Sequence, residues 1–213
     1  MLETRSGKRR EILMKAAARL FLKHGYDGVA LDDIVERAGG SKSTVYNLFG
    51  SKCGLFIASI DSLCREFNEP LRDLDYTGLD LRRSLEKLGV ALVTLIVQQE
   101  YLALHRLVIA ESGHCPELGQ AWYELGPKET LGLIARVLHS HTDRSRDGAG
   151  RVHSAAGFLH DALVTDLQHR LLSGVGARTD PRALNARVRE TVRLFLTGFE
   201  ARNGSIERAS LDR

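Results

Sequence analysis

Residues 39–52 read GGSKSTVYNLFGSK, and the order of residue types in this stretch decides the fold. Two glycines interrupt the chain at its start, and Gly50 interrupts it again near its end. Between these breaks, Ser41 is placed to cap a helix over residues 42–49, because a serine oxygen accepts hydrogen bonds from the first free N–H groups of a helix. Apolar residues recur at helical spacing along this helix and predict one inward face, made of Val45, Leu48 and Phe49.

The outward face of the same short helix is polar, and a segment this short cannot satisfy its hydrogen-bond donors alone. DNA can accept hydrogen bonds from these donors. Its phosphates accept bonds from Lys, Ser, Thr and Tyr side chains, and an Asn side chain can hydrogen-bond the edge of an adenine base. Lys52 follows in the first turn of the next helix, where free N–H groups after Ser51 also attract a phosphate. The candidate DNA-binding residues of the short helix are Lys42, Ser43, Thr44, Tyr46 and Asn47.

The residues before this stretch predict two more helices, which complete a three-helix head. From residue 9 to residue 24, apolar residues fall at i, i+4 and i+8, and Gly25 then ends that helix. A shorter helix over residues 32–38 stops at the paired glycines. Two short helices joined by a glycine-containing turn after a longer helix match the helix-turn-helix arrangement, which places its second helix in the major groove of DNA.

The positive charge of the chain is concentrated in this head. Residues 1–50 hold nine of the 30 Lys and Arg residues but only six of the 27 Asp and Glu residues, so the whole net charge of +3 lies there. A localised basic region is typical of a module that binds a polyanion, and Arg9 and Arg10 extend the candidate DNA contacts to the first helix. The alternative is a solvated, slightly basic surface.

The rest of the chain also follows helical periodicity and predicts an all-α fold of about nine helices. A fourth helix is expected over residues 51–68, capped by Ser51 and stopped by Pro70, and a polar, frayed tail is expected after residue 203. We expect a DNA-binding domain over residues 1–52, a larger helical domain for ligand binding and dimerisation over residues 53–203, and the tail over residues 204–213. The remaining helices are expected over residues 80–99, 101–113, 116–125, 127–139, 151–173 and 181–202.

Several functional classes find no support in the sequence. The N-terminus has no apolar region of a secretory signal, and no apolar run approaches the length of a membrane span. Three cysteines without a CxxC pair favour a reducing compartment, so we expect a cytoplasmic protein. No HExxH, GxSxG, GxGxxG or GxxxxGKS motif occurs, and neither the HxH of residues 139–141 nor Cys115 beside His114 has a recognised ligand spacing. We therefore expect no enzyme, no cofactor and no metal, and a redox role for Cys115 has little to support it.

Residues 8 to about 60 resemble the DNA-binding domain of the TetR family of bacterial regulators. The resemblance rests on ILMKAAARLFLKHGYDGVALDDIVERAGGSKSTVYNLFGSKCGLF, with its Gly25-Tyr26 step, its Tyr-x-x-Phe and its Gly-Ser-Lys. It implies a homodimer that reads a palindromic operator, most often as a repressor, and a C-terminal domain that binds a small molecule and thereby releases the DNA. It also implies phosphate contacts from Tyr46 and Lys52, and it places Lys42, Ser43, Thr44 and Asn47 at recognition-helix positions.

Two positions depart from the family pattern. Ala30 stands where a Ser or Thr commonly caps the second helix, although Asp32 or Asp33 can compensate at that helix end. Gly40 stands where a small β-branched residue is usual, which predicts a less tightly packed turn. These departures keep an alternative open, in which the chain is a helical interaction protein or a non-specific DNA-binding protein that has lost operator specificity.

The segment LHRLVIAESGHCPELGQAWYELGP, residues 104–127, resembles the middle of the core in a broad subgroup of TetR-type regulators, which does not fix a ligand. Polar or aromatic groups within apolar helices are the candidates for a ligand site, since such sites are mostly apolar with a few orienting polar groups. For each of them the alternative is a surface residue or a hydrogen-bonded core residue. They are His105, Arg106, Glu111, His114, Trp122, Tyr123, His160 and Asp161.

The last two long helices carry apolar stripes that suit a four-helix dimer interface, with two helices from each subunit. The alternative is that the stripes face the core of their own chain. The candidate interface residues are Phe158, Leu159, Ala162, Leu163, Val192, Phe195, Leu196 and Phe199.

Overall fold

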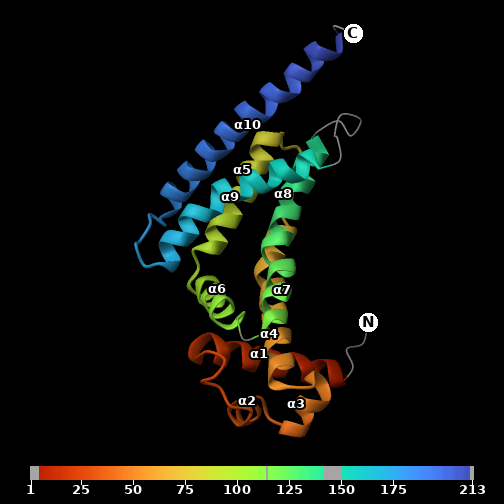
Figure 1. The fold of residues 1–213 in the computed structure, drawn as a ribbon, viewed down its shortest axis with the longest axis vertical. Coiled ribbons are helices and arrows are strands. Elements are labelled where there is room, and N and C mark those ends of the chain that lie inside the picture. The colour runs from red at the N-terminus through yellow and green to blue at the C-terminus, as the bar shows by residue number, and fades with distance from the viewer. Residues whose placement is uncertain (1–4, 114, 142–149, 212–213) are drawn as a thin grey trace. The chain divides into compact units, whose positions relative to one another are not determined.

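The computed structural model describes residues 5–113, 115–141 and 150–211, with side chains described as far as residue 199 (Figure 1). All regular secondary structure in these ranges is helical, which confirms the all-α prediction, and the ten helices correspond to the ten ranges predicted above, against an expected total of about nine. They are α1 (Arg5–His24), α2 (Leu31–Ala38), α3 (Lys42–Phe49), α4 (Lys52–Arg72), α5 (Leu81–Ile96), α6 (Gln99–Glu111), α7 (Pro116–Leu125), α8 (Pro127–His141), α9 (Arg151–Leu172) and α10 (Pro181–Leu211).

The described residues fall into two compact units. The first contains the chain up to residue 69 together with residues 99–128, and the second contains residues 70–98 together with the chain from residue 129 onward. Helices α1, α2, α3, α6 and α7 and most of α4 therefore belong to the first unit, and α5, α9, α10 and most of α8 belong to the second. The functional division expected after residue 52 stays a prediction.

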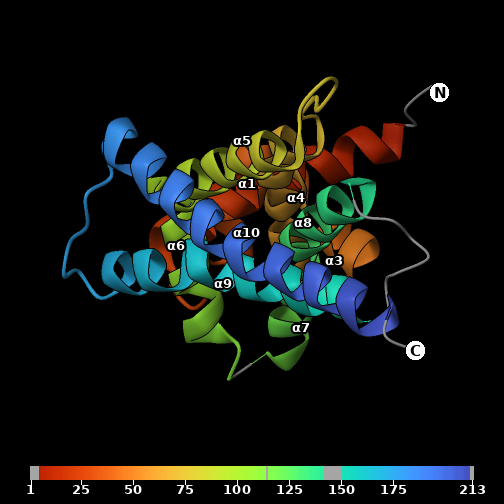
Figure 2. The same cartoon turned by 90° about the horizontal axis from the view of Figure 1, so that it is seen from above.

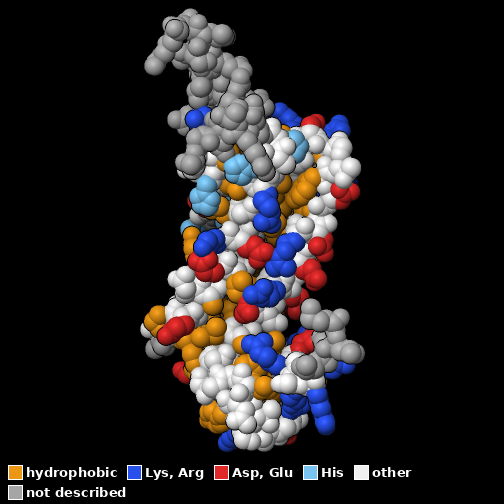
Figure 3. Space-filling model, turned by 90° about the vertical axis from the view of Figure 1, so that its right-hand side faces the viewer, with side chains coloured by type: hydrophobic (Ala, Val, Ile, Leu, Met, Phe, Trp, Pro, Cys, Tyr) orange, Lys and Arg blue, Asp and Glu red, His pale blue; other side chains and the backbone are white. Residues whose placement is uncertain are grey.

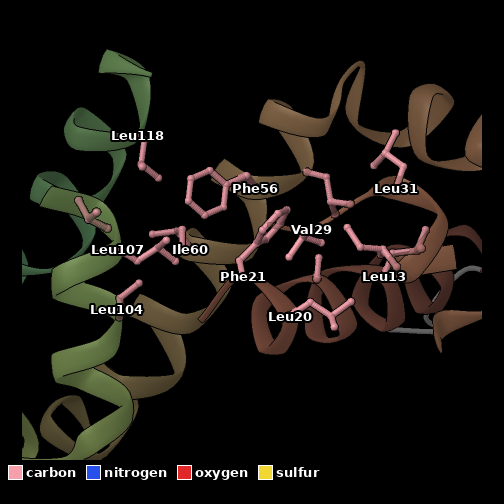
Figure 4. Packing of buried hydrophobic residues seen from close by; sticks show 14 of the residues in the cluster. Leu13, Leu20, Phe21, Val29, Leu31, Phe56, Ile60, Leu104, Leu107 and Leu118 are labelled. Atoms are coloured by element: carbon pink, nitrogen blue, oxygen red, sulfur yellow. The ribbon is translucent and has the colours of Figure 1, made fainter. Parts of the chain in front are cut away.

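The core of the first unit forms around Phe21 of α1 and Phe56 of α4, whose rings meet edge to face with centroids 4.7 Å apart. Leucines of α6 and α7 close this core, as the side chains in Figure 4 show. Most of the stripe predicted on the first helix is buried, with Leu13, Ala17 and Phe21 fully inaccessible, whereas Ile12 is 48% exposed. Burial of each such leucine or phenylalanine stabilises the unit by about 2–3 kcal/mol.

The second unit is built on α5, α9 and α10, which pack side by side (Figure 2). Helices α5 and α10 approach closely at Gly89, where an added Cβ would come within 2.8 Å of Val188. Arg187 of α10 donates to the backbone carbonyls of Ala162 and Leu163 on α9, both at 3.3 Å. The side chain of Arg187 therefore bonds α10 to α9 beside the apolar packing.

Several helix ends differ from the prediction, among them the C-terminal ends of α4 and α10. Helix α4 runs through Pro70 to Arg72 instead of stopping near residue 68. A proline in the last turn removes only one backbone bond, so the helix continues for two residues before it ends. Helix α10 continues to Leu211, whereas a tail was expected after residue 203.

Charged side chains of both signs are interleaved on the face shown in Figure 3. Lys128 pairs with Glu124 and Arg65 pairs with Asp61, both at i,i+4 spacing on a helix. This pattern agrees with the even charge balance of the chain after residue 50. No single helix within the described ranges has both the length and the apolarity to cross a bilayer, and α5 and α6 would do so only if taken together across their break.

Candidate nucleic-acid interface

The start of α3 is fixed by the side chain of Ser41, as predicted. Its Oγ accepts a hydrogen bond from the backbone N–H of Thr44 at 3.3 Å. The same oxygen lies 2.7 Å from Ser43 Oγ and 3.1 Å from Thr44 Oγ1. Three hydroxyl groups therefore gather at the N-terminus of α3, where unpaired N–H groups favour a negatively charged ligand.

Helix α3 separates its side chains into one buried and one exposed face. Val45 is fully buried, and Leu48 and Phe49 are partly buried against the core of the first unit. Tyr46 is 52% exposed, and Asn47 is also exposed. The outward face of α3 is thus polar and accessible, which is the arrangement that a helix inserted into a DNA groove requires.

Lys42 is paired with a carboxylate of the neighbouring helix. Its Nζ lies 2.9 Å from Oδ2 of Asp32 on α2, and both side chains are more than half exposed. The hydrogen bond and the charge of Asp32 raise the pKa of Lys42. An approaching phosphate must therefore compete with Asp32 for this ammonium group, a constraint that sequence spacing alone did not reveal.

The turn between α2 and α3 is filled by an arginine of α1, which corrects the expectation of a loosely packed turn at Gly40. Nη1 of Arg9 donates to the carbonyl of Ala38 at 2.8 Å. Gly40 has a φ of +97°, and a Cβ added there would lie 2.2 Å from Nη2 of Arg9. The guanidinium group therefore occupies the space that a β-branched residue at position 40 would need.

The N-terminus of α2 is completed by Asp33, one of the two residues proposed to compensate for Ala30. The backbone N–H of Ala30 donates to Oδ2 of Asp33 at 2.8 Å. This is the carboxylate half of a capping box, and it offsets part of what a Ser or Thr cap would contribute. Helix α2 is therefore held at its start without a hydroxyl group at position 30.

Lys52 is anchored to the segment after α1. Its Nζ donates to the carbonyl of Tyr26 at 2.6 Å and lies 4.2 Å from the centroid of the Tyr26 ring. Ser51 caps α4 as predicted, because its Oγ accepts from the N–H of Gly54 at 2.9 Å. The positive charge of Lys52 thus sits at the capped start of α4, directly after the turn that follows α3.

The two arginines predicted on α1 lie in different environments. Arg9 is partly buried at the turn between α2 and α3, whereas Arg10 is exposed and its guanidinium stands 5.2 Å from the ring centroid of Phe49. A hollow of about 490 Å³ lies along the N-terminal part of α1. Three of its five lining residues are basic, and the sequence did not single out most of the five, which are Arg5, Ser6, Lys8, Arg9 and Ile12.

The candidate ligand residues divide between the two units. In the first unit, His105 is buried and its ring meets that of Trp122 edge to face at 4.9 Å, while Arg106 and Tyr123 are exposed and Glu111 is partly buried. In the second unit, Nε2 of His160 lies 3.2 Å from Oγ1 of the buried Thr130. Asp161 is exposed beside His160, and His114 lies outside the described residues.

Two buried hydroxyl groups of the second unit were not singled out from the sequence. Oγ of Ser84 and the phenol oxygen of Tyr76 are inaccessible, and neither has a hydrogen-bond partner among the described residues. Burial raises the pKa of Tyr76. A buried hydroxyl without a partner costs roughly 1–3 kcal/mol, so a polar partner would stabilise either group.

The predicted dimer stripes point mainly into the second unit. Seven of the eight residues are buried or partly buried, and in addition the Phe195 ring stacks on Phe199 at 5.3 Å. Phe158 of α9 is 67% exposed, and Leu194 of α10, which was not predicted, is 58% exposed. The buried candidates are Leu159, Leu163, Val192, Phe195 and Leu196, and Ala162 and Phe199 are intermediate.

Two family models match this chain. The model described as bacterial regulatory proteins, tetR family, matches residues 13–59, which contain α2, α3 and most of α1. The model described as AefR-like transcriptional repressor, C-terminal domain, matches residues 83–201, more than half of the chain. Both matches agree with the helical architecture described above.

Individual relatives are named as HTH-type transcriptional regulators or repressors. An uncharacterized HTH-type transcriptional regulator of Mycobacterium bovis is 29% identical over 144 residues, which cover 68% of this chain and 65% of that protein. The HTH-type transcriptional repressor BdcR of Escherichia coli is 25% identical over 179 residues, 79% of this chain and 77% of its own length.

Solved structures extend the likeness to nearly the full chain. A putative TetR-family regulator from Mesorhizobium loti superposes with a TM-score of 0.82 at 29% identity, covering 92% of this chain and 98% of the other. The flavonoid-responsive regulator FrrA superposes with a TM-score of 0.73 at 26% identity, covering 90% and 97%.

Proposed function

The chain belongs to the TetR family of bacterial transcriptional regulators, and we propose that it is a repressor that binds a palindromic operator as a homodimer and is released by a small-molecule effector. Members of this family bind DNA and act as dimers, and they are regulators rather than enzymes. A protein that acts on chromosomal DNA works in the bacterial cytoplasm, where we place it.

The observation that carries the proposal is the division of α3 into a buried and an accessible face. Val45 is fully buried, whereas Tyr46 and Asn47 are exposed one and two residues later. In the major groove, the phenol of Tyr46 would bond a phosphate and the amide of Asn47 would bond an adenine. Ser43 and Thr44 would meet a phosphate at the N-terminus of α3.

Basic groups around α3 would supply the electrostatic part of the affinity. Lys42 and Lys52 flank the helix at its start and after its end, and Arg10 stands beside Phe49 at its C-terminal turn. Each phosphate neutralised by such a group adds about 0.9 to the slope of log affinity against log salt. Arg9 would act indirectly, by holding the turn before α3 through its bond to Ala38.

The alternative, a head that has lost operator specificity, depended on Ala30 and Gly40. The carboxylate of Asp33 accepts a different hydrogen bond, from the N–H of Ala30, at the start of α2, and Arg9 fills the turn beside Gly40. The two departures from the family pattern therefore have local compensation. This favours a head that still positions α3 for base readout.

An effector site within the second unit would use the buried polar groups of that unit. Ser84 and Tyr76 offer buried hydroxyl groups without partners among the described residues, and His160 with Thr130 offers a buried polar pair. A site of this kind, mostly apolar with a few polar groups, suits a small organic molecule. The flavonoid-responsive name of one structural relative supports a small-molecule effector as a class.

The decisive experiment is selection of bound duplexes from a random DNA library by the purified protein at a stated salt concentration. We expect recovery of one inverted repeat, because two copies of α3 in a symmetric dimer read the same sequence on opposite strands. Recovery of unrelated, salt-sensitive duplexes only would reject a specific operator and favour the non-specific alternative.

Two variants distinguish a phosphate contact, which positions the protein on DNA, from a base contact, which recognises the sequence of the selected duplex. Tyr46→Phe removes only the phenol oxygen, so we expect affinity to fall roughly tenfold or less and equally for operator and random DNA. Asn47→Ala should cost about 1–3 kcal/mol on the operator and little on random DNA. Equal losses on both duplexes for Asn47→Ala would contradict its assignment to base readout.

A further inference from the structure

Two cysteines that lie 62 positions apart in the sequence meet in the first unit. Sγ of Cys53, in the first turn of α4, lies 2.8 Å from Sγ of Cys115, the N-cap residue of α7. Both side chains are free thiols and both are partly exposed, so a small solute can reach them. Cys64, the third cysteine, is buried in α4.

The two sulfur atoms lie in different surroundings. Burial, and then the hydrogen bond with Cys115, raise the pKa of Cys53 to about 11, so Cys53 stays a thiol at neutral pH. Cys115 stands at the N-terminus of α7, and its Sγ is also 3.7 Å from a carboxylate oxygen of Glu117.

We propose that Cys53 and Cys115 form an oxidation site, at which hydrogen peroxide converts the thiol pair into an intramolecular disulfide. Cys115 Sγ attacks one peroxide oxygen, the O–O bond breaks, and a sulfenic acid and one water form. Cys53 Sγ then attacks the Cys115 sulfur, the S–O bond breaks, and the hydroxyl leaves with the Cys53 proton as a second water. Two thiols and one peroxide thus become one disulfide and two waters, and peroxide receives the two electrons.

The geometry requires only a small local adjustment for this bond. The sulfur atoms must approach from 2.8 Å to a bond length of about 2.05 Å. Both residues begin a helix, so a shift of either side chain leaves the interior of α4 and α7 unchanged. Closing the bond would fix the first turn of α4, which carries Lys52, against the start of α7.

The test uses the full-length protein and hydrogen peroxide, and it counts thiols before and after oxidation under denaturing conditions. We expect two of the three thiols to disappear, with a mass loss of about two hydrogens, recovery by dithiothreitol, and a peptide that joins Cys53 to Cys115. Cys64→Ala is the matched control, because it keeps the pair and should still lose two thiols. Cys53→Ser and Cys115→Ser should each lose the intramolecular bond.

The melting temperature gives a second test, which does not depend on how well the Cys115→Ser variant folds. Because the bond closes a long loop, the oxidised wild type should melt higher than the reduced protein by about 5 °C or more, and Cys53→Ser should show no such rise. Three reactive thiols after oxidation, disulfides only between chains, or sulfinic acid on Cys115 without a bond to Cys53 would each overturn the proposal. None of these readouts uses DNA, so they are independent of the function proposed above.

Discussion

The guanidinium group of Arg9 stands in the space that a side chain at position 40 would occupy. Nη2 of Arg9 would lie 2.2 Å from a Cβ on Gly40, and Nη1 of the same group bonds the carbonyl of Ala38 at 2.8 Å. One side chain of α1 therefore fixes the end of α2 and the turn that leads into α3. The position of the proposed recognition helix depends on this contact.

Gly40→Ala is expected to lower the free energy of unfolding by about 1–3 kcal/mol, because a φ of +97° is strained for a residue with a Cβ. Urea unfolding measures this cost. Gly132→Ala in α8 is the control: no atom lies within 4 Å of its added Cβ, so it should raise the free energy of unfolding by about 0.5–1 kcal/mol.

The same contact predicts coupling between the two positions. In Arg9→Ala the space beside Gly40 is open, so Gly40→Ala should cost less there than in the wild type, by about 0.5 kcal/mol or more. Additive costs in a double-mutant cycle would show that Arg9 and Gly40 act independently, contrary to the observed packing.

Asp32→Asn is expected to strengthen DNA binding. The substitution removes the carboxylate that holds Lys42 Nζ at 2.9 Å, and with it a negative charge beside the proposed recognition helix. Lys42 is then free to neutralise a phosphate, so the slope of log affinity against log salt should steepen by about 0.9. Because this pair is exposed, the urea midpoint should hardly change.

A control separates the release of Lys42 from the general change in charge. Glu36→Gln removes the same charge from an exposed position of α2, so it should alter affinity less than Asp32→Asn and leave the salt slope nearly unchanged. Equal effects of the two substitutions would mean that Lys42 does not gain a phosphate contact.

The fold followed from local patterns in the sequence, whereas the site required contacts between distant residues. The glycines, the Ser41 cap and the spacing of Leu13, Ala17 and Phe21 all act over a few residues, so the helices of the head could be predicted. The partners of Arg9 and Lys52 lie 29 and 26 positions away in the sequence. No periodicity reveals a bond to a backbone carbonyl at that separation.

The burial of apolar residues on α9 and α10 could not be predicted from the sequence either. Apolar stripes on α9 and α10 could be found from their spacing, but a stripe does not tell which residues face the core of their own chain. Val192 and Leu196 are buried, whereas Phe158 and Leu194 are exposed. The packing of α10 on α5 and α9 decides this difference, and it depends on the tertiary structure.

The raised pKa of Cys53 predicts a pH dependence of stability in the reduced protein. A group whose pKa is higher in the folded state stabilises that state below its unfolded pKa, and this contribution is lost as pH rises through the folded value. For Cys53 the loss should occur between pH 9 and about pH 11. Urea unfolding of wild type and Cys53→Ser over this range should show a shallower decline in the variant.

Tyr26 also has a raised pKa, caused first by burial, and it titrates in the same alkaline range. Cys53 also contributes to the raised pKa of Tyr26, so the difference between wild type and Cys53→Ser contains the loss of the thiol together with the lowered pKa of Tyr26. Parallel curves from pH 8 to pH 11 would show that the Cys53 thiol titrates at the same pH in the folded and unfolded chains.

The exposed pair Phe158 and Leu194 predicts where the dimer forms. Phe158 is 67% exposed on α9 and Leu194 is 58% exposed on α10, large apolar surfaces that a partner subunit would cover. Phe158→Asp or Leu194→Asp should raise the dimer dissociation constant by about thirtyfold or more, as expected for a central interface residue. Sedimentation velocity over a range of protein concentrations measures this change.

Two comparisons distinguish loss of the dimer from loss of the fold. Val175→Asp changes an equally exposed residue in the connector between α9 and α10, and it should leave the dimer intact. Phe195→Ala removes a buried ring that stacks on Phe199, so it should cost about 3–5 kcal/mol of unfolding free energy. If Phe158→Asp and Leu194→Asp sediment like the wild type while Val175→Asp dissociates, the interface lies at the connector instead.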